Sequence, residues 1–241
     1  MYAVVMSELT KLKRTLTLKF VWIMPLIALA LSFILMRGDY FQFGSYNWWY
    51  MFLLPGSLSI FCTSIIQKDA KLKYRNILSL PICSSKIWLG KMLAGFVFLF
   101  ASCFLFFIGV TIGSYFSEQD IPLLSSALGS FVLFLTYIWQ IPLCMFLAKK
   151  IGTFGALLIN LFANIGFSIL SVINGLGFVP YAIPARLMCP ILKLHPNGIP
   201  LESGNALLST DIILPAILVS IMSFAVIVIF TTFNSRDLRE K

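Results

Sequence analysis

Charged residues are scarce in this chain. Only 11% of the 241 residues are Asp, Glu, Lys or Arg, whereas soluble domains carry roughly 25%. Ion- or proton-coupled carriers and intramembrane hydrolases need ionisable groups at membrane depth. Six long stretches hold none, nor any His: 20–36, 47–66, 92–114, 123–148, 151–173 and 212–233. The sequence therefore argues against a stand-alone carrier or a membrane-embedded enzyme.

Other chemical signatures are missing as well. The phosphate-binding loop GxxxxGK[ST] is absent, so the chain has no ATP site of that kind. Its one histidine, His195, has no zinc-type neighbours, and its five cysteines form no CxxC pair. We therefore expect no catalytic residue, bound cofactor or metal in this chain.

What the chain does have is apolar length. Apolar residues make up 59% of it, and the six stretches run from 17 to 26 residues. About 20 residues are needed for a helix to cross the hydrocarbon core of a bilayer. We predict an all-α membrane protein with six transmembrane helices, which leave no room for a soluble catalytic domain.

The basic residues predict how these helices are oriented. If the N-terminus is cytoplasmic, 15 of the 18 Lys and Arg residues fall in cytoplasmic segments, whereas four acids lie inside and five outside. That is the positive-inside pattern, which counts Lys and Arg rather than net charge. Both termini should then be cytoplasmic, and the net charge of +9 is explained by the membrane surface without nucleic acid.

The N-terminal arm, residues 1–19, has a helical pattern. Apolar residues recur at spacings of three and four, and charged residues occupy the other faces. This predicts an amphipathic helix lying in the membrane interface, the alternative being a plain extension of the first span. The apolar positions are Val4, Val5, Leu9, Leu12 and Leu16; the charged ones are Glu8, Lys11, Lys13 and Arg14.

The cytoplasmic loop 67–91 mixes basic residues with apolar ones. Pro81 should end a short helix near Ser79 or Leu80, and Ser84 and Ser85 can cap the next helix. The apolar residues need something to pack against. That is either a partner protein or the inner ends of this chain's own helices.

The segment 174–211 is the longest predicted outer loop. Its five prolines exclude a long helix, yet it is too apolar for a freely solvated loop. We expect short helical pieces at the outer interface before the last span. Within it, Asn197 and Gly198 follow Pro196 and signal a tight turn, so a structural role for His195 is favoured over ligand contact.

Few polar residues interrupt the spans. Asn160 and Asn164 are four residues apart and share one helix face, and Gln140 lies in the preceding span. They either line a substrate path or hydrogen-bond between helices, and we favour the hydrogen bonds. Prolines within spans predict kinks at Pro25, Pro55, Pro142 and Pro215.

This arrangement resembles the permeases of ABC-2 type exporters. Residues Asp69 to Pro81 and on to Gly90-Lys91 look like the cytoplasmic coupling region of that family. Within the family, the chain is most similar to the permeases of lantibiotic or bacteriocin immunity transporters. That likeness rests on its length, on Tyr46-Asn47-Trp48-Trp49 and on His195-Pro196-Asn197-Gly198-Ile199-Pro200.

The resemblance implies a fold with an N-terminal elbow helix, a coupling helix between spans two and three, and short outer helices before span six. It also implies two ATPase subunits, which carry ATP and Mg, and a second, related permease. The implied coupling residues are Lys71, Leu72, Lys73, Tyr74, Arg75, Ile77, Leu78, Leu80 and Pro81. The implied substrate path or outer gate comprises Gln140, Asn160, Asn164, Tyr181, His195 and Asn197.

The expected function is that of a permease in a bacterial plasma membrane that expels a cationic antimicrobial peptide, with ATP hydrolysis on a separate subunit. Two alternatives stay open. The substrate could be a drug or a lipid-linked sugar, or the chain could be a peptide-sensing membrane subunit that does not transport. The sequence identifies neither the peptide nor whether the permease pair is homo- or heterodimeric.

Overall fold

The computed structural model describes residues 2–13, 16–36, 39–71, 83–117, 120–173 and 176–234. Within these ranges the regular secondary structure is helical, apart from an isolated β-bridge between Leu194 and Pro200. The predicted all-α fold is confirmed for this part of the chain. The elements in chain order are α1 (Tyr2–Leu12), α2 (Leu16–Met36), α3 (Phe41–Trp48), η1 (Trp49–Leu53), α4 (Leu54–Lys71), α6 (Ser84–Gly113), η2 (Ser114–Phe116), α7 (Leu123–Tyr137), α8 (Gln140–Leu170), η3 (Leu176–Phe178), α9 (Ile183–Leu192), η4 (Ala206–Leu208) and α10 (Ile213–Asn234).

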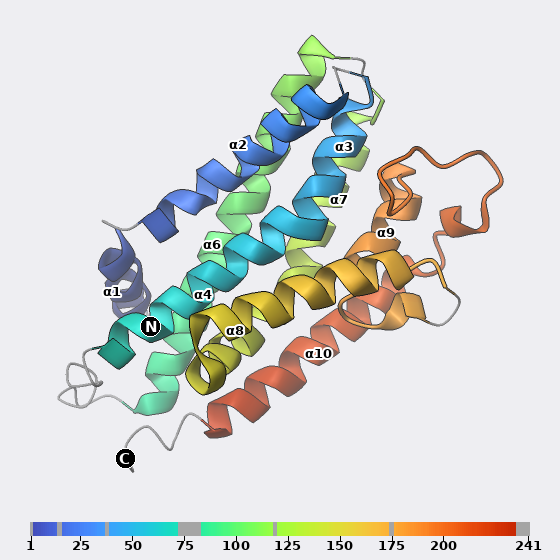
Figure 1. Ribbon diagram of the computed structural model, residues 1–241. Helices are drawn as coiled ribbons and strands as arrows, with labels where there is room; N and C mark the ends of the chain where they lie inside the picture. The colour runs from blue at the N-terminus through green and yellow to red at the C-terminus, as the bar shows by residue number, and fades with distance from the viewer. Residues whose placement is uncertain are drawn as a thin grey trace.

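Five helical segments among the described residues are long and apolar enough to cross a membrane (Figure 1). The segment around α4 is 72% buried within the protein, whereas those of α2 and α10 are 17% and 11% buried. The α4 segment is therefore central, and α2 and α10 are peripheral. The five are Thr17–Met36, Phe41–Asp69, Ser84–Phe116, Leu123–Leu170 and Ile213–Asn234.

The fourth segment, Leu123–Leu170, has 48 residues and contains two of the six predicted spans. It folds back on itself. Gln140 and Asn164 are 24 residues apart, which is about 36 Å along a straight helix, yet their side chains hydrogen-bond at 3.0 Å. The reversal is at Gly152, whose φ of 80° and ψ of −179° lie in a region that essentially only glycine adopts.

A second break, between α7 and α8, has a different cause. Pro142 has no N–H to donate to the carbonyl of Ile138 four residues earlier. Instead, the N–H of Ile141 donates to that carbonyl at 3.1 Å, the spacing of a tighter turn. The kink predicted at Pro142 therefore separates α7 from α8.

Pro55 has a similar effect in the central segment. η1 is a π-helical turn in which the N–H of Leu54 donates to the carbonyl of Trp49, five residues back. In that register the residue at position 55 would donate its N–H to the carbonyl of Tyr50, but Pro55 has no N–H. The hydroxyl of Tyr137 on α7 donates to this carbonyl instead. A side chain from another helix thus completes the backbone of the central helix.

The segment predicted as short helical pieces contains η3, α9 and η4. Most residues of α9 are buried, and the helix ends where Lys193 adopts a left-handed conformation with φ 55°. Leu192 packs against Gly129 of α7, where a Cβ would lie 2.9 Å from its Cδ2. α9 therefore belongs to the protein interior.

Candidate substrate path and coupling region

Three side-chain amides meet inside the bundle, and we name them the amide cluster: Gln140, Asn160 and Asn164. All three are fully buried. Asn160 Nδ2 donates to Gln140 Oε1 at 2.9 Å, and Gln140 Nε2 donates to Asn164 Oδ1 at 3.0 Å. The chain reversal at Gly152 brings the two asparagines opposite Gln140. The cluster therefore depends on that turn.

The amide cluster is joined to two further elements. Asn160 Nδ2 lies 2.9 Å from Ser59 Oγ on α4, and the Tyr181 hydroxyl donates to Asn160 Oδ1 at 3.1 Å. The Tyr181 ring packs edge-on against Trp139, with ring centroids 4.6 Å apart. Four of the six residues predicted for a substrate path or outer gate are thus brought together: Gln140, Asn160, Asn164 and Tyr181.

The hydrogen bonds of the cluster suit an interhelical role. Gln140 Oε1 also accepts from Asn164 Nδ2 at 3.3 Å, across the two arms of α8. Asn164 Nδ2 also donates, within its own arm, to the Asn160 carbonyl at 2.7 Å. Each such bond between membrane helices contributes about 0.6–2 kcal/mol. This geometry agrees with the hydrogen-bonding interpretation that the sequence favoured.

The other two predicted residues, His195 and Asn197, lie in a tight turn. The N–H of Asn197 donates to His195 Nδ1 at 3.3 Å, and the N–H of Ile199 donates to Asn197 Oδ1 at 3.1 Å. Gly198 has a φ of 90°, as the turn requires. Asn47 Nδ2 donates to the Pro196 carbonyl at 2.8 Å and so ties the turn to α3. Among the described residues, the turn shares no hydrogen bond with the amide cluster.

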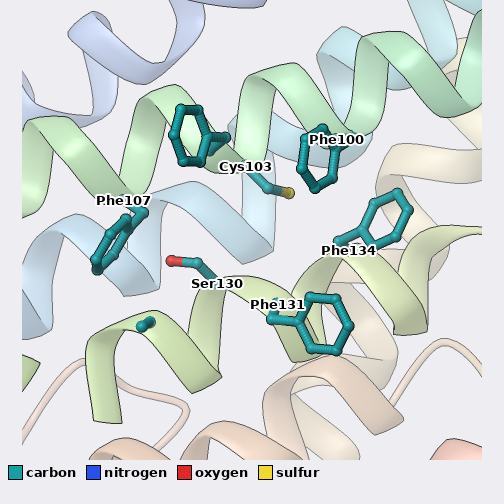
Figure 2. A pocket seen from close by; sticks show the side chains of 8 residues that line it. Phe100, Cys103, Phe107, Ser130, Phe131 and Phe134 are labelled. Carbon is teal, nitrogen blue, oxygen red and sulfur yellow. The ribbon is translucent and has the colours of Figure 1, made fainter. Parts of the chain in front are cut away.

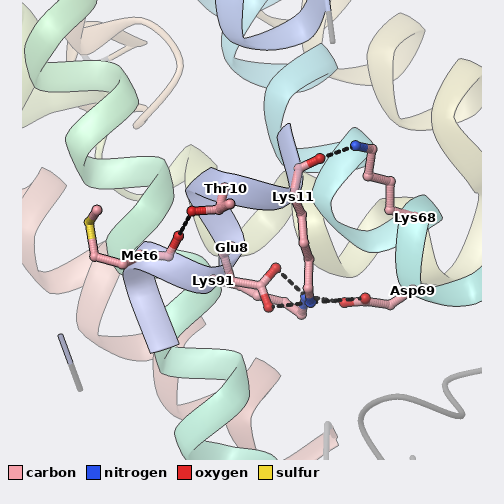
Figure 3. Close-up of polar contacts among 7 residues, drawn as sticks. All are labelled: Met6, Glu8, Thr10, Lys11, Lys68, Asp69 and Lys91. Atoms are coloured by element: carbon pink, nitrogen blue, oxygen red, sulfur yellow. Dashed lines mark hydrogen bonds and ion pairs between the residues drawn. The ribbon is translucent and has the colours of Figure 1, made fainter. Parts of the chain in front are cut away.

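A second polar site was not predicted: four charged side chains form a closed ring, the ionic quartet of Glu8, Lys11, Asp69 and Lys91 (Figure 3). Lys11 Nζ lies 2.7 Å from Glu8 Oε1 and 3.1 Å from Asp69 Oδ1. Lys91 Nζ lies 2.8 Å from Glu8 Oε2 and also pairs with Asp69 Oδ2. Glu8, Asp69 and Lys91 are only 3%, 2% and 3% exposed. Each carboxylate therefore bridges both ammonium groups in a largely desolvated setting.

The charges of the quartet reinforce one another. Burial alone lowers the pKa of Lys11, but the hydrogen bonds and charges of Glu8 and Asp69 outweigh it and raise that pKa above its usual value of 10.5. Because the pKa of Lys11 is higher in the folded than in the unfolded protein, its charged form stabilises the fold, and this contribution is fully present at pH values below 10.5. That contribution is lost only as the pH rises through the higher folded-state pKa.

Two further contacts hold α1 in place. Lys68 Nζ donates to the backbone carbonyl of Lys11. Gly90 allows α1 to approach α6 closely, because a Cβ there would lie 2.4 Å from Val4 Cγ1. Gly90-Lys91, which carried part of the family resemblance, therefore has a double role: Gly90 admits α1 and Lys91 completes the quartet.

The predicted coupling residues lie between the two ends that the quartet joins. Lys71 is the last residue of α4. Leu72, Lys73, Tyr74, Arg75, Ile77, Leu78, Leu80 and Pro81 fall outside the described residues, so their roles stay predictions. Asp69 precedes this segment and Lys91 follows it.

The sequence contains one indication of the quartet, which the spacing of its apolar residues does not reveal. Glu8 is the only acid in residues 1–19, and Asp69 is the only acid in residues 67–91. A lone carboxylate among many basic residues is a candidate for a specific ion pair. The pairing itself links residues 83 positions apart and has no local pattern.

An apolar groove of about 230 Å³ lies between α6 and α7 (Figure 2). Its polar hydroxyl, that of Ser130, lies 2.9 Å from the Tyr46 hydroxyl and is thereby occupied. The groove therefore offers mainly apolar surface. It is lined by Phe100, Cys103, Phe104, Phe107, Ala127, Ser130, Phe131 and Phe134.

No group of three or more His, Cys, Asp or Glu residues that could hold a metal ion occurs in the described part of the chain. The quartet's two carboxylates are already neutralised by two ammonium groups. Both polar sites join helical elements of the described part of the chain.

Comparison with known proteins gives one match. A family model described as ABC-2 family transporter protein matches residues 4–168, from α1 to the second arm of α8. The comparisons found no similar curated protein and no similar solved structure.

Proposed function

Because the chain belongs to the ABC-2 family of transporter proteins, we propose that it is the permease subunit of an ATP-driven exporter that removes a lantibiotic or similar cationic antimicrobial peptide from the membrane. The observation that carries the transport function is the family match, which covers more than half of the chain. The family provides the transmembrane component of an ABC transporter, and it implies an ATPase partner.

The proposed topology has six crossings, with both termini in the cytoplasm. The fold-back at Gly152 supports it, because it divides the 48-residue segment into two apolar arms. The distribution of Lys and Arg supports the orientation, since it places 15 of 18 on one side. α1 would serve as the elbow helix at the membrane interface.

The proposed mechanism couples two ends of the molecule. Two ATPase subunits bind residues 72–82, close on ATP and move the helices on either side of that segment. The buried amide cluster lies beside Tyr181, and rearrangement of its hydrogen bonds would open a path toward the segment that holds His195 and Asn197. This chain supplies the path, and the ATPases supply the free energy.

The peptide substrate is supported by the resemblance alone. Residues 174–211 carry only two acids, Glu202 and Asp211, so a cationic peptide would be held by apolar contacts more than by charge. A related but different second permease is part of the proposal, as lantibiotic immunity transporters imply. Export of a drug or of a lipid-linked sugar is the competing outcome.

The first test is recovery of the complex. The C-terminally tagged chain is extracted from its native host in mild detergent, and its partners are identified by mass spectrometry. We expect an ABC-type ATPase and a second permease. If cross-linked preparations repeatedly yield the chain alone, the ATP-driven function is wrong.

The second test concerns the coupling segment and the substrate. Deleting the chain should sensitise cells to a cationic lantibiotic but leave sensitivity to apolar drugs unchanged. Leu78→Asp should have the same effect as deletion while the protein accumulates normally, because a charge there disrupts an apolar contact with the ATPase. Sensitisation to drugs, or a cell-envelope sugar defect, would reassign the substrate.

A further inference from the structure

The two ends of the proposed coupling segment are joined directly. Asp69 in the last turn of α4 and Lys91 in the second turn of α6 form an ion pair across 22 residues of sequence. The described ends of α4 and α6 that flank residues 72–82 in the sequence are therefore held together by this pair. A force on the end of either helix is therefore shared with the other.

α1 is joined to the same two helix ends. Lys91 pairs with both Glu8 and Asp69, and Asp69 also pairs with Lys11. Charges alternate around the ring, with two of each sign. A buried ion that loses its partner is strongly unfavourable, so the three buried groups, Glu8, Asp69 and Lys91, are expected to separate only together.

Independent contacts also join α1 to α4 and α6. Lys68 on α4 donates to the carbonyl of Lys11, and Val4 on α1 fits against Gly90 on α6. α1 thus contacts α4 and α6 through both charged and apolar groups.

We propose that the ionic quartet makes α1 and the adjoining ends of α4 and α6 one rigid coupling unit, through which movement of residues 72–82 is passed to the membrane helices. Glu8, Lys11, Asp69 and Lys91 are positioning residues in this unit. The inference rests on the proposed function, because it requires an ATPase that drives residues 72–82. It adds α1, which is remote in sequence from the coupling segment, to the parts that move.

The alternation of charge provides the test. Reversing one charge, as in Glu8→Lys or Lys91→Glu, places three like charges in the ring. Reversing all four, with Glu8→Lys, Lys11→Glu, Asp69→Lys and Lys91→Glu, restores the alternation and leaves the number of lysines unchanged. The fourfold variant also keeps the balance of basic residues that orients the helices.

Docking of α1 is measured by electron paramagnetic resonance on the purified complex in nanodiscs. Spin labels are placed at Tyr2→Cys and Ile112→Cys, in a background that carries Cys83→Ser. Tyr2 and Ile112 are 78% and 54% exposed, and Ile112 lies about 33 Å along α6 from Gly90. We expect a narrow distance distribution in the parent protein and in the fourfold variant, and a broad one in each single reversal.

Coupling is measured as ATP turnover by the same complexes at equal permease content. Single reversals should lower turnover at least tenfold, and the fourfold variant should return to within twofold of the parent. A role confined to folding predicts less protein with unchanged turnover per complex. Broad distances with normal turnover would likewise contradict the coupling role, and narrow distances in the single reversals would show that the quartet does not hold α1.

The two proposals fail separately. If no ATPase accompanies the parent protein, the exporter function and the coupling role are both wrong, while the distance measurement still decides whether the quartet fixes α1. If the fourfold variant does not accumulate, Glu8→Gln is compared with the double variant Glu8→Gln, Lys91→Gln, which removes one charge of each sign. Narrow distances must then return in the double variant.

Discussion

At the scale of single residues, the missing side chain of Gly90 and the hydroxyl of Tyr137 determine how two pairs of helices contact each other. Gly90 leaves space that Val4 of α1 fills. Tyr137 supplies the hydrogen bond that Pro55 cannot give to the Tyr50 carbonyl. Neither role could be predicted from the sequence, because each depends on a residue in a different helix.

Gly90→Ala should destabilise the protein by about 1–3 kcal/mol, since the added methyl group would overlap Val4 and push α1 outward. The measurement is the free energy of unfolding in detergent. Val4→Ala in the same chain should recover most of the loss, because it removes the overlapping atoms. Additive effects of the two substitutions would show that Gly90 does not receive Val4.

Tyr137→Phe should cost about 1–3 kcal/mol, because it leaves the buried carbonyl of Tyr50 without a donor. Tyr115→Phe is the matched control, as Tyr115 is 83% exposed. Thermal unfolding of the two variants should separate them clearly. Equal midpoints would mean that the π-helical turn satisfies its own backbone.

At the scale of elements, the reversal within α8 was predicted nearly at the correct place. The pair Lys149-Lys150 divided the two predicted spans, and the turn occurs at Gly152. The charge pattern locates the turn because ammonium groups stay at the membrane surface. It could not identify the residue with the unusual backbone, since glycine is common in membrane helices.

Gly152→Ala and Gly166→Ala should have opposite effects although both lie in α8. A Cβ meets nothing within 4 Å at either position, so packing is matched. At Gly152 the positive φ makes alanine cost about 1–3 kcal/mol, whereas at Gly166 alanine should stabilise the helix by up to about 1 kcal/mol. Unfolding midpoints that shift in the same direction would contradict this account of the turn.

The N-terminal arm shows the limit of periodicity. Its spacing predicted a helix, and α1 is helical from Tyr2 to Leu12. The pattern assigned Glu8 to a polar face, whereas the structure buries it. A charged residue on an amphipathic helix is expected to face water. Glu8 is buried because its ion pair with Lys91 on α6, which also pairs with Asp69 on α4, compensates for the loss of water.

At the scale of the whole molecule, composition alone was sufficient to predict a membrane protein, and the family match agrees with that class. The amide cluster was partly predictable, because Gln140, Asn160 and Asn164 stand out in apolar surroundings. For the quartet the sequence marked out only Glu8 and Asp69, each a lone acid among basic residues, and not their pairing with Lys91, which is distant in the sequence. Polar residues are informative where they are rare.

The orientation of the molecule can be tested with one native thiol. Cys83 is exposed at one end of α6, and Tyr115 lies just beyond the other end, about 45 Å away along a 30-residue helix. A membrane-impermeant maleimide should label Cys83 in inside-out vesicles but not in intact cells. Tyr115→Cys with Cys83→Ser should show the reverse, and labelling of both from one side would contradict the proposed topology.

Synthesis of the chain determines when the quartet can close. Glu8 is made 83 residues before Lys91, which at about 5–20 residues per second leaves roughly 4–17 s between them. During that interval Glu8 has only Lys11 as a partner within the quartet. Docking of α1 against α6 therefore cannot be complete before Lys91 has been made. The N-terminal helix, although first from the ribosome, can reach its final position only after α2, α4 and the start of α6 have been made.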